Sequence, residues 1–187
     1  ESSWILVNGL PELSKDTLRS LTLLTLGPQF RGSRNVYLGV EAIRTVFALI
    51  KSIVSDRITE EGETCLEVLS AAGRVYRIEF APDPDIAIRQ ILRDGSVRNR
   101  IAIEIKGGTD FSNIHNRLGE AEKSHQKAKG EGFTQFWTVV NVAGLEPPVW
   151  SQETPTTNEL FYLEQIADVR SEEYARFREY LVSELGI

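Results

Sequence analysis

The residues best suited to chemistry lie close together in one apolar segment. Glu104 and Lys106 are two positions apart in a run that alternates with isoleucines, Ile101 to Lys106. Such alternation predicts a β-strand, in which successive side chains point to opposite faces, so Glu104 and Lys106 share one face and the isoleucines fill the other. Acids and an ammonium group gathered at a sheet edge can hold a divalent metal ion, orient a water molecule and neutralise a phosphate. These are the requirements of phosphodiester hydrolysis.

A second acid is expected to converge on the same place. Asp85 opens a strand-like run, Asp85 to Leu92, which an Asp94-Gly95 turn connects to a second run, Asn99 to Lys106. Such a turn between two strand-like runs is typical of a hairpin. Asp83 also follows a proline and is the alternative to Asp85, which we prefer because an apolar run follows it directly.

The simplest alternative is that Glu104 and Lys106 are the solvent-exposed face of an edge strand. The pair Gly107-Gly108, directly after Lys106, favours a site instead. Glycines allow a close approach of backbone or a positive φ angle, and functional residues gather on such loops.

The order of these motifs resembles a known group of enzymes. A Pro-Asp pair, then Glu-Ile-Lys on a strand, then a helix, resembles the PD-(D/E)XK nuclease superfamily. The longer string from Ile103 to Arg117, continued from Gly119 to Ala128, is similar to the catalytic region of XcyI/XmaI-type restriction endonucleases. The resemblance is most specific from about Pro82 to Ala128 and weak elsewhere.

The resemblance implies catalytic roles for Asp85, Glu104 and Lys106. Asp85 and Glu104 would bind Mg2+, together with the main-chain carbonyl of Ile105. Mg2+ prefers oxygen ligands and usually keeps several waters, so two carboxylates and a substrate phosphate are sufficient anchors. Lys106, beside two acids, is expected to remain an ammonium and to act by electrostatics and positioning.

A polar cluster at the start of the following helix is the candidate DNA-binding surface. Main-chain N–H groups at a helix start favour phosphate, and Arg and Asn have the forked donors that read base edges. Two lysines four positions apart could follow the phosphate backbone. The candidate residues are Asn113, His115, Asn116, Arg117, Lys123 and Lys127. Surface solvation and helix capping are the alternative explanation for all six.

Hydrophobic periodicity predicts an α+β fold, with a central mixed sheet of about five strands flanked by helices, as in restriction endonucleases. Pro147-Pro148 is expected to interrupt regular structure. The expected helices cover 14–27, 40–54, 112–130 and 171 onward, and the expected strands are 64–70, 74–80, 85–92, 99–106 and 133–142, with a short element at 160–166.

Composition places the chain among ordinary globular proteins. The 187 residues predict a single domain, 1–187, with a catalytic core at about 36–145, and the absence of methionine suggests a fragment of a longer chain. No apolar run is long enough to span a membrane, so we expect no membrane partner and a cytoplasmic location in a bacterial or archaeal cell. The single cysteine excludes a cysteine-based zinc site.

Charge is distributed unevenly around the candidate site. The net charge is -6, but nine of the 27 acidic residues lie after position 145, and from Ile86 to Gly130 nine basic residues accompany five acidic ones. A local basic excess is compatible with a polyanionic partner.

The leading hypothesis is a Mg2+-dependent type II restriction endonuclease that hydrolyses phosphodiester bonds of double-stranded DNA. The resemblance further implies a short palindromic GC-rich site of the CCCGGG kind and a homodimer, because a two-fold protein matches a two-fold site. The alternatives are a repair or junction-resolving nuclease of the same superfamily, a catalytically silent DNA-binding module, and a non-enzymatic interaction domain.

Overall fold

The computed structural model describes residues 15, 37–142, 144–145 and 147–187. The chain divides into two units, Glu1–Tyr37 and Leu38–Ile187, and the fold presented below is that of the second. The predicted helix at 14–27 lies outside the described residues, apart from Lys15. The single-domain organisation therefore stays a prediction.

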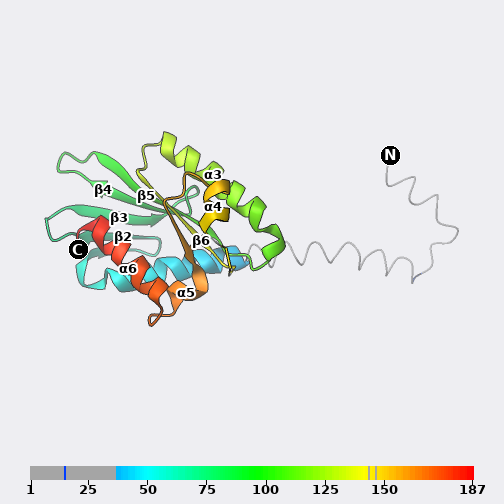
Figure 1. Ribbon diagram of the computed structural model, residues 1–187. Coiled ribbons are helices and arrows are strands. Elements are labelled where there is room, and N and C mark those ends of the chain that lie inside the picture. Colours follow the sequence, from blue (N-terminus) through cyan, green and yellow to red (C-terminus); the bar gives the residue numbers. More distant parts are fainter. Residues whose placement is uncertain (1–14, 16–36, 143, 146) are drawn as a thin grey trace. The chain divides into compact units, whose positions relative to one another are not determined.

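A seven-stranded mixed sheet forms the centre of this unit (Figure 1). The strands lie in the sheet in the order of the sequence. Neighbours from β1 to β5 are antiparallel, and β5, β6 and β7 are parallel. The strands are β1 (Ile58–Glu61), β2 (Cys65–Leu69), β3 (Val75–Phe80), β4 (Ile86–Ile91), β5 (Val97–Lys106), β6 (Gln135–Val140) and β7 (Glu159–Tyr162).

The predicted α+β class, a mixed sheet flanked by helices, is confirmed, but the expected count of about five strands is wrong. The two additional strands, β1 and β7, have only four residues each, and β7 falls in the short element expected at 160–166, whose type was not predicted. β1 is mostly exposed and lacks apolar alternation, and β7 continues directly into a short helix, α5 (Leu163–Ala167). Periodicity has too few residues to act on in such elements.

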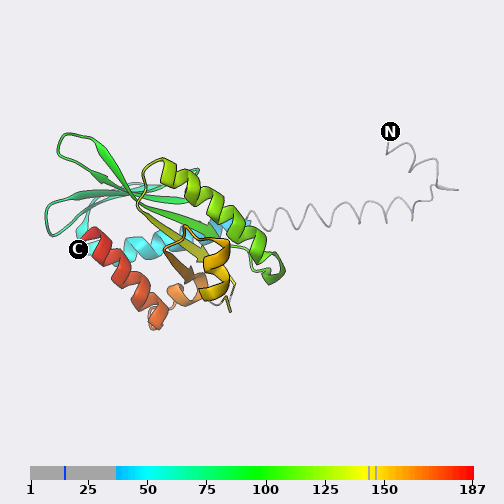
Figure 2. The ribbon, with the colours of Figure 1, turned by 45° about the horizontal axis from the view of Figure 1, so that its top comes forward.

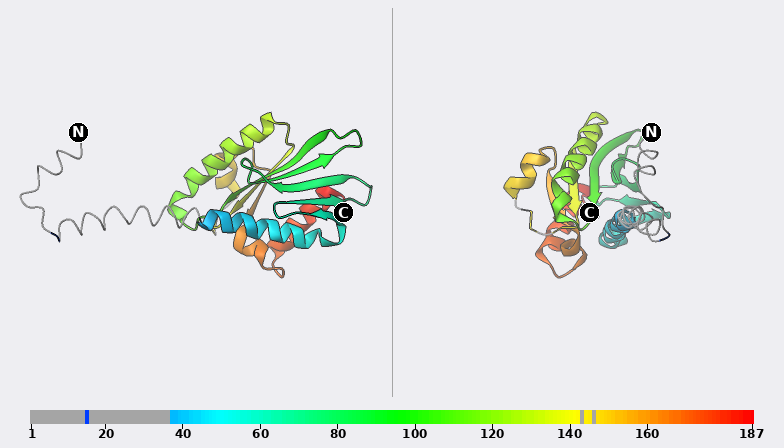
Figure 3. Two further views of the ribbon diagram at one scale, coloured as in Figure 1. Left: turned by 180° about the vertical axis from the view of Figure 1, so that it is seen from behind. Right: turned by 90° about the vertical axis from the view of Figure 1, so that its right-hand side faces the viewer.

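Helices cover the two faces of the sheet unequally (Figures 1 and 3). The helix at 37–53, α5 and α6 (Glu172–Leu185) supply buried residues to one face, which we call the apolar face. A single long helix, α3 (Ile114–Gly130), lies against the other face, which we call the α3 face, and α4 (Pro147–Glu153) contacts α3. Two short 3-10 helices, η1 (Ser55–Arg57) and η2 (Phe111–Asn113), complete the fold.

Alternation along β5 divides its residues between these faces. Ile101, Ile103 and Ile105 are buried in the main core with Trp137 of β6, which pairs with Ile103 in the parallel register. Ala102, on the α3 face, packs in a separate small cluster that includes Ala128 of α3. Small side chains at this position allow α3 to lie close to the sheet.

Two hairpins project from one end of the sheet, away from α4 (Figure 2). The β4–β5 turn contains Gly95 at a φ of 82°, a left-handed conformation that favours glycine. Asp94 accepts hydrogen bonds from the main chain and hydroxyl of Ser96. The predicted turn is therefore confirmed, and Lys106 lies at the opposite end of the sheet.

The last elements give one confirmed and one corrected expectation. Ser171 caps α6 as predicted, since its hydroxyl accepts a hydrogen bond from the N–H of Tyr174 at 2.9 Å. Pro147-Pro148 does not interrupt regular structure but begins α4. Proline is tolerated in the first turn of a helix, where its missing N–H has no intrahelical partner. Within the described parts of the chain, no helix combines the length and apolarity needed to cross a membrane.

Candidate active site

Glu104 lies on the α3 face of β5, between the sheet and α3. It is only 7% exposed. The ammonium of Lys106 donates to Oε1 of Glu104 at 2.8 Å, as expected for side chains that share a strand face. The hydroxyl of Ser124, on α3, lies 2.7 Å from Oε2. Both oxygens of this buried carboxylate are thus held by hydrogen bonds.

Asp85 lies beside Glu104, at the point where β4 begins. The antiparallel register pairs Ile86 with Ile103, so the next position of each strand brings Asp85 opposite Glu104. Oδ2 of Asp85 accepts a hydrogen bond from the main-chain N–H of Ile105 at 2.7 Å. This bond fixes the carboxylate against the end of β5.

The electrostatics of Asp85 reflect this crowding. Burial, and secondly the charge of Glu104, raise the pKa of Asp85 to about 6, against the opposing effects of the Ile105 N–H and Lys106. Two adjacent carboxylates in a partly buried site repel each other, and a bound cation would relieve that repulsion.

Asp83, the alternative acid, belongs to the same cluster but has different partners. It accepts hydrogen bonds from the Ser124 hydroxyl and, at 2.8 Å, from the ammonium of Lys127. Burial raises the pKa of Asp83, but the hydrogen bonds from Lys127 and Ser124 outweigh it and leave the pKa below its ordinary value. A cationic partner already compensates this acid, whereas Asp85 accepts a hydrogen bond only from a main-chain N–H among the described residues.

Ser124 is the member of this cluster that the sequence prediction missed. It lies three positions after Ala121 and four before Ala128, both of which face the sheet. A polar residue on an otherwise small and apolar helix stripe, opposite a strand with an acid, is a signal that could have identified it.

The two glycines after Lys106 allow close packing, as predicted. A Cβ on Gly107 would lie 2.5 Å from the carbonyl oxygen of Leu38 and 2.6 Å from Cβ of Ala42. A Cβ on Gly108 would lie 2.0 Å from Nη1 of Arg117. A side chain at Gly107 would press on the backbone of Leu38 and displace the end of β5, whereas one at Gly108 would only displace the flexible end of Arg117.

The predicted DNA-binding residues near the start of α3 have varied surroundings. Asn116 donates to the side chain of Asn113 at 2.8 Å, and both are exposed. His115 is exposed and paired with Glu153 of α4. Arg117 is half-buried against Gly108, and its Nη1 has no hydrogen-bond partner among the described residues. Of these four residues, the two asparagines and His115 have exposed side chains, and Arg117 does not.

The two lysines further along α3 also differ in their surroundings. Lys123 is exposed and forms no ion pair with any described residue. Lys127 is exposed but paired with Asp83. Glu41, an acid near the start of the 37–53 helix, pairs with Arg44 at 3.2 Å.

A buried polar network lies next to the acids on the α3 face. His125 is fully buried, and its Nε2 lies 2.9 Å from the hydroxyl of Thr138, the residue that pairs with Glu104 in the sheet. Burial lowers the pKa of His125 to about 4. The network continues through Thr157 and Thr154 to Glu122. His125 is therefore a neutral core residue, out of reach of DNA.

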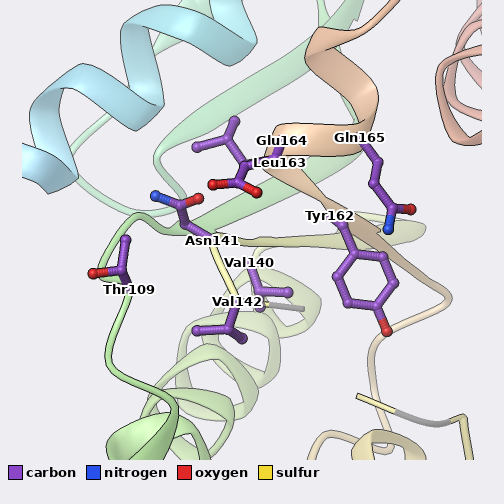
Figure 4. Close-up of a pocket in the computed structure, with 8 residues that line it drawn as sticks. All are labelled: Thr109, Val140, Asn141, Val142, Tyr162, Leu163, Glu164 and Gln165. Carbon is purple, nitrogen blue, oxygen red and sulfur yellow. The ribbon is translucent and has the colours of Figure 1, made fainter. Parts of the chain in front are cut away.

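A pocket of about 220 Å³ lies at the carboxyl ends of β6 and β7 (Figure 4). Asn141 connects it to the end of β5, because its main-chain N–H donates to the carbonyl of Lys106 and its side chain donates to the carbonyl of Gly107. None of Asp85, Glu104 or Lys106 lines it. The lining residues are Thr109, Val140, Asn141, Val142, Tyr162, Leu163, Glu164 and Gln165.

The donor set at the acids suits a hard cation. The described residues contain no group of three or more His, Cys, Asp and Glu side chains arranged to hold a metal ion. The two neighbouring carboxylates, Asp85 and Glu104, form a smaller set, in which every side-chain donor atom is an oxygen. Such an oxygen-only set fits Mg2+, which keeps several waters and needs few protein ligands, and does not fit zinc.

Comparison with known proteins agrees with this geometry. A model of the XcyI restriction endonuclease family matches residues 1–187. The chain belongs to this family. It is 50% identical over 171 residues to the type II restriction enzyme Cfr9I of Citrobacter freundii, and 49% identical over 171 residues to the type II restriction enzyme XcyI of Xanthomonas campestris pv. cyanopsidis.

The matched segments differ in their share of each protein. They cover 91% of this chain in both comparisons, but 52% of Cfr9I and 51% of XcyI. The chain thus spans about half the length of these two relatives. No solved structure matches it.

Proposed function

We propose that this protein is a Mg2+-dependent type II restriction endonuclease that hydrolyses phosphodiester bonds of double-stranded DNA and leaves a 5'-phosphate. The observation that carries the proposal is the cluster of Asp85, Glu104 and Lys106 at the adjoining ends of β4 and β5. Membership of the XcyI family and the names of the two relatives support it.

Asp85 and Glu104 are the proposed Mg2+ ligands, with the carbonyl of Ile105 as the third. In an antiparallel pair, the N–H and C=O of one residue point toward the same neighbouring strand. The N–H of Ile105 donates to Asp85, so its carbonyl is directed to the side of β5 where Asp85 lies. Mg2+ bound there would activate a water molecule and stabilise charge on the leaving oxygen.

Lys106 is the proposed positioning group for the attacking water and the scissile phosphate. Its side chain is 17% exposed, and its ammonium lies 2.8 Å from Glu104 and 3.8 Å from the more exposed Glu120. An ammonium that is already oriented by a carboxylate can attract a phosphate without reorganising during the reaction.

The helix α3 supplies the proposed DNA contacts. Asn113, His115 and Asn116 are exposed at the start of α3, where main-chain N–H groups favour phosphate. Lys123 is an exposed cation for the DNA backbone, and Lys127 would contribute once DNA competes with Asp83 for it. Arg117, whose Nη1 has no hydrogen-bond partner among the described residues, would contribute by turning outward from Gly108.

The resemblance to XcyI/XmaI-type restriction endonucleases implies how the DNA sequence is recognised. We propose a short palindromic GC-rich site of the CCCGGG kind, read by a homodimer, because two-fold symmetric sites match two-fold symmetric proteins.

Plasmid cleavage tests the proposal. The protein should cut a plasmid that carries CCCGGG into discrete fragments with Mg2+, and should not cut with EDTA or without the site. Glu104→Ala should slow cutting by at least about 100-fold, the scale of losing a preorganised electrostatic group. Glu60→Ala, the same change at an exposed strand position, is the matched control.

Other outcomes would replace the proposal with one of its rivals. Cleavage of branched DNA alone would indicate a junction-resolving nuclease, and a gel shift without cutting would indicate a silent binding module. Full activity of Glu104→Ala would remove Glu104 from the site.

A further inference from the structure

Glu104 depends on α3 for its orientation. Lys106 holds Oε1 from the same strand, but Oε2 has a single described partner, the Ser124 hydroxyl at 2.7 Å. Each carboxylate oxygen has two lone-pair directions, so these two hydrogen bonds leave one direction free on each oxygen for a cation. The carboxylate is thus fixed without being blocked.

Ser124 lies between Glu104 and a charged pair formed by Asp83 and Lys127. Its hydroxyl also hydrogen bonds Asp83, whose other oxygen accepts from Lys127 at 2.8 Å. A hydroxyl carries one hydrogen and can donate to one carboxylate at a time. Asp83 and Glu104 therefore compete for the hydrogen of Ser124, and the donor that Lys127 supplies to Asp83 lessens that competition. A chain of contacts therefore runs from Lys127 through Asp83 and Ser124 to Glu104.

We propose that Ser124 is a positioning residue that holds Glu104 in the orientation needed to bind the metal ion, and that Asp83 acts on Ser124 and is not a ligand. This inference rests on the proposed function, because it assigns Glu104 as a ligand. Residues that hold metal ligands in place typically contribute 10- to 100-fold to metal affinity. Ser124 therefore affects metal binding through Glu104, without touching substrate or metal.

Mn2+ binding, followed by the electron paramagnetic resonance signal of the free ion, tests this without any need for cleavage. Ser124→Ala should weaken Mn2+ binding by about tenfold or more. Ser124→Thr, which keeps the hydroxyl, should stay within about threefold of the wild type. Ser183→Ala, the same change at an exposed position of α6, should leave Mn2+ binding unchanged.

Alanine favours helices, so Ser124→Ala should keep α3 folded. Equal Mn2+ affinity of Ser124→Ala and the wild type would overturn the positioning role while leaving the proposed function intact. Equal losses in Ser124→Ala and Ser124→Thr would overturn it as well, because the hydroxyl would then be irrelevant. Failure of the wild type to bind Mn2+ would overturn the proposed function itself.

Asp83→Asn separates the two roles of that acid. The neutral amide competes less strongly than a carboxylate for the hydrogen of Ser124, although it loses the ion pair with Lys127, so any loss of Mn2+ affinity should be smaller than in Ser124→Ala. A loss larger than in Ser124→Ala would make Asp83 a direct ligand and overturn its assignment.

Discussion

The two faces of the sheet use the same strand for different purposes. On the apolar face, Ile103 of β5 packs with Trp137, whose ring makes edge contacts with Phe161 and Phe177 at centroid distances of 5.6 and 5.8 Å. On the α3 face, one residue further along, Glu104 lies buried among polar groups.

The residues that stabilise the fold and the residues proposed for chemistry thus lie on different faces of the sheet. Burial of apolar surface stabilises the fold, whereas burial of carboxylates and an imidazole costs free energy unless each has a partner. The apolar face can therefore offset the cost of burying polar groups on the reverse of the same strands. A variant on the apolar face should lower the free energy of unfolding with little effect on metal binding. A variant of the acids on the α3 face should weaken metal binding.

Trp137→Ala should give the largest loss of stability. Trp137 is fully buried, and its truncation removes aromatic contacts and leaves a cavity, at a cost of about 3–5 kcal/mol in the free energy of unfolding. Urea denaturation measures this cost. Mn2+ affinity at low temperature should stay close to the wild type, because the acids lie on the other face; a parallel loss of both would show that the faces are not separable.

His125→Gln should change the pH dependence of stability by a smaller amount. The pKa of His125 falls from 6.5 to about 4 on burial, so the unfolded chain takes up a proton before the folded chain does as pH falls below 6.5. Stability from this group is thus present at neutral pH and is lost between about pH 6.5 and 4, by about 2 kcal/mol from pH 7 to pH 5.

Urea denaturation of both proteins at pH 7 and pH 5 isolates this contribution, because glutamine does not titrate and can still reach Thr138. The wild type should lose about 2 kcal/mol more than the variant over this interval. Identical pH dependence of the two proteins would show that His125 is not held neutral.

Much of the fold could be predicted because its longest elements have strong local patterns. The apolar stripe of α3 and the alternation along β5 specify burial directly, and the Asp94-Gly95 turn specifies the hairpin. β1 could not be predicted, and β7 was expected only as a short element of unspecified type, because their pairing depends on neighbouring strands and not on their own four residues. Pro147 was misread because a proline that begins a helix and one that ends it look alike in sequence.

The site could be predicted only in part, for a similar reason. Glu104 and Lys106 are close in sequence, so strand geometry alone places them together. The partners of Asp83 lie 41 and 44 positions away, at Ser124 and Lys127, and no local pattern relates them. Sequence reasoning therefore identified the acids but not the helix residue that links them.

Stabilisation by Mg2+ tests most directly whether Asp85 and Glu104 share one cation. At a Mg2+ concentration ten times its dissociation constant, a ligand that binds only the folded state raises the free energy of unfolding by about 1.4 kcal/mol. Urea denaturation with and without Mg2+ should show this gain for the wild type and little or none for Asp85→Asn or Glu104→Gln. A gain in either variant equal to that of the wild type would contradict the shared site.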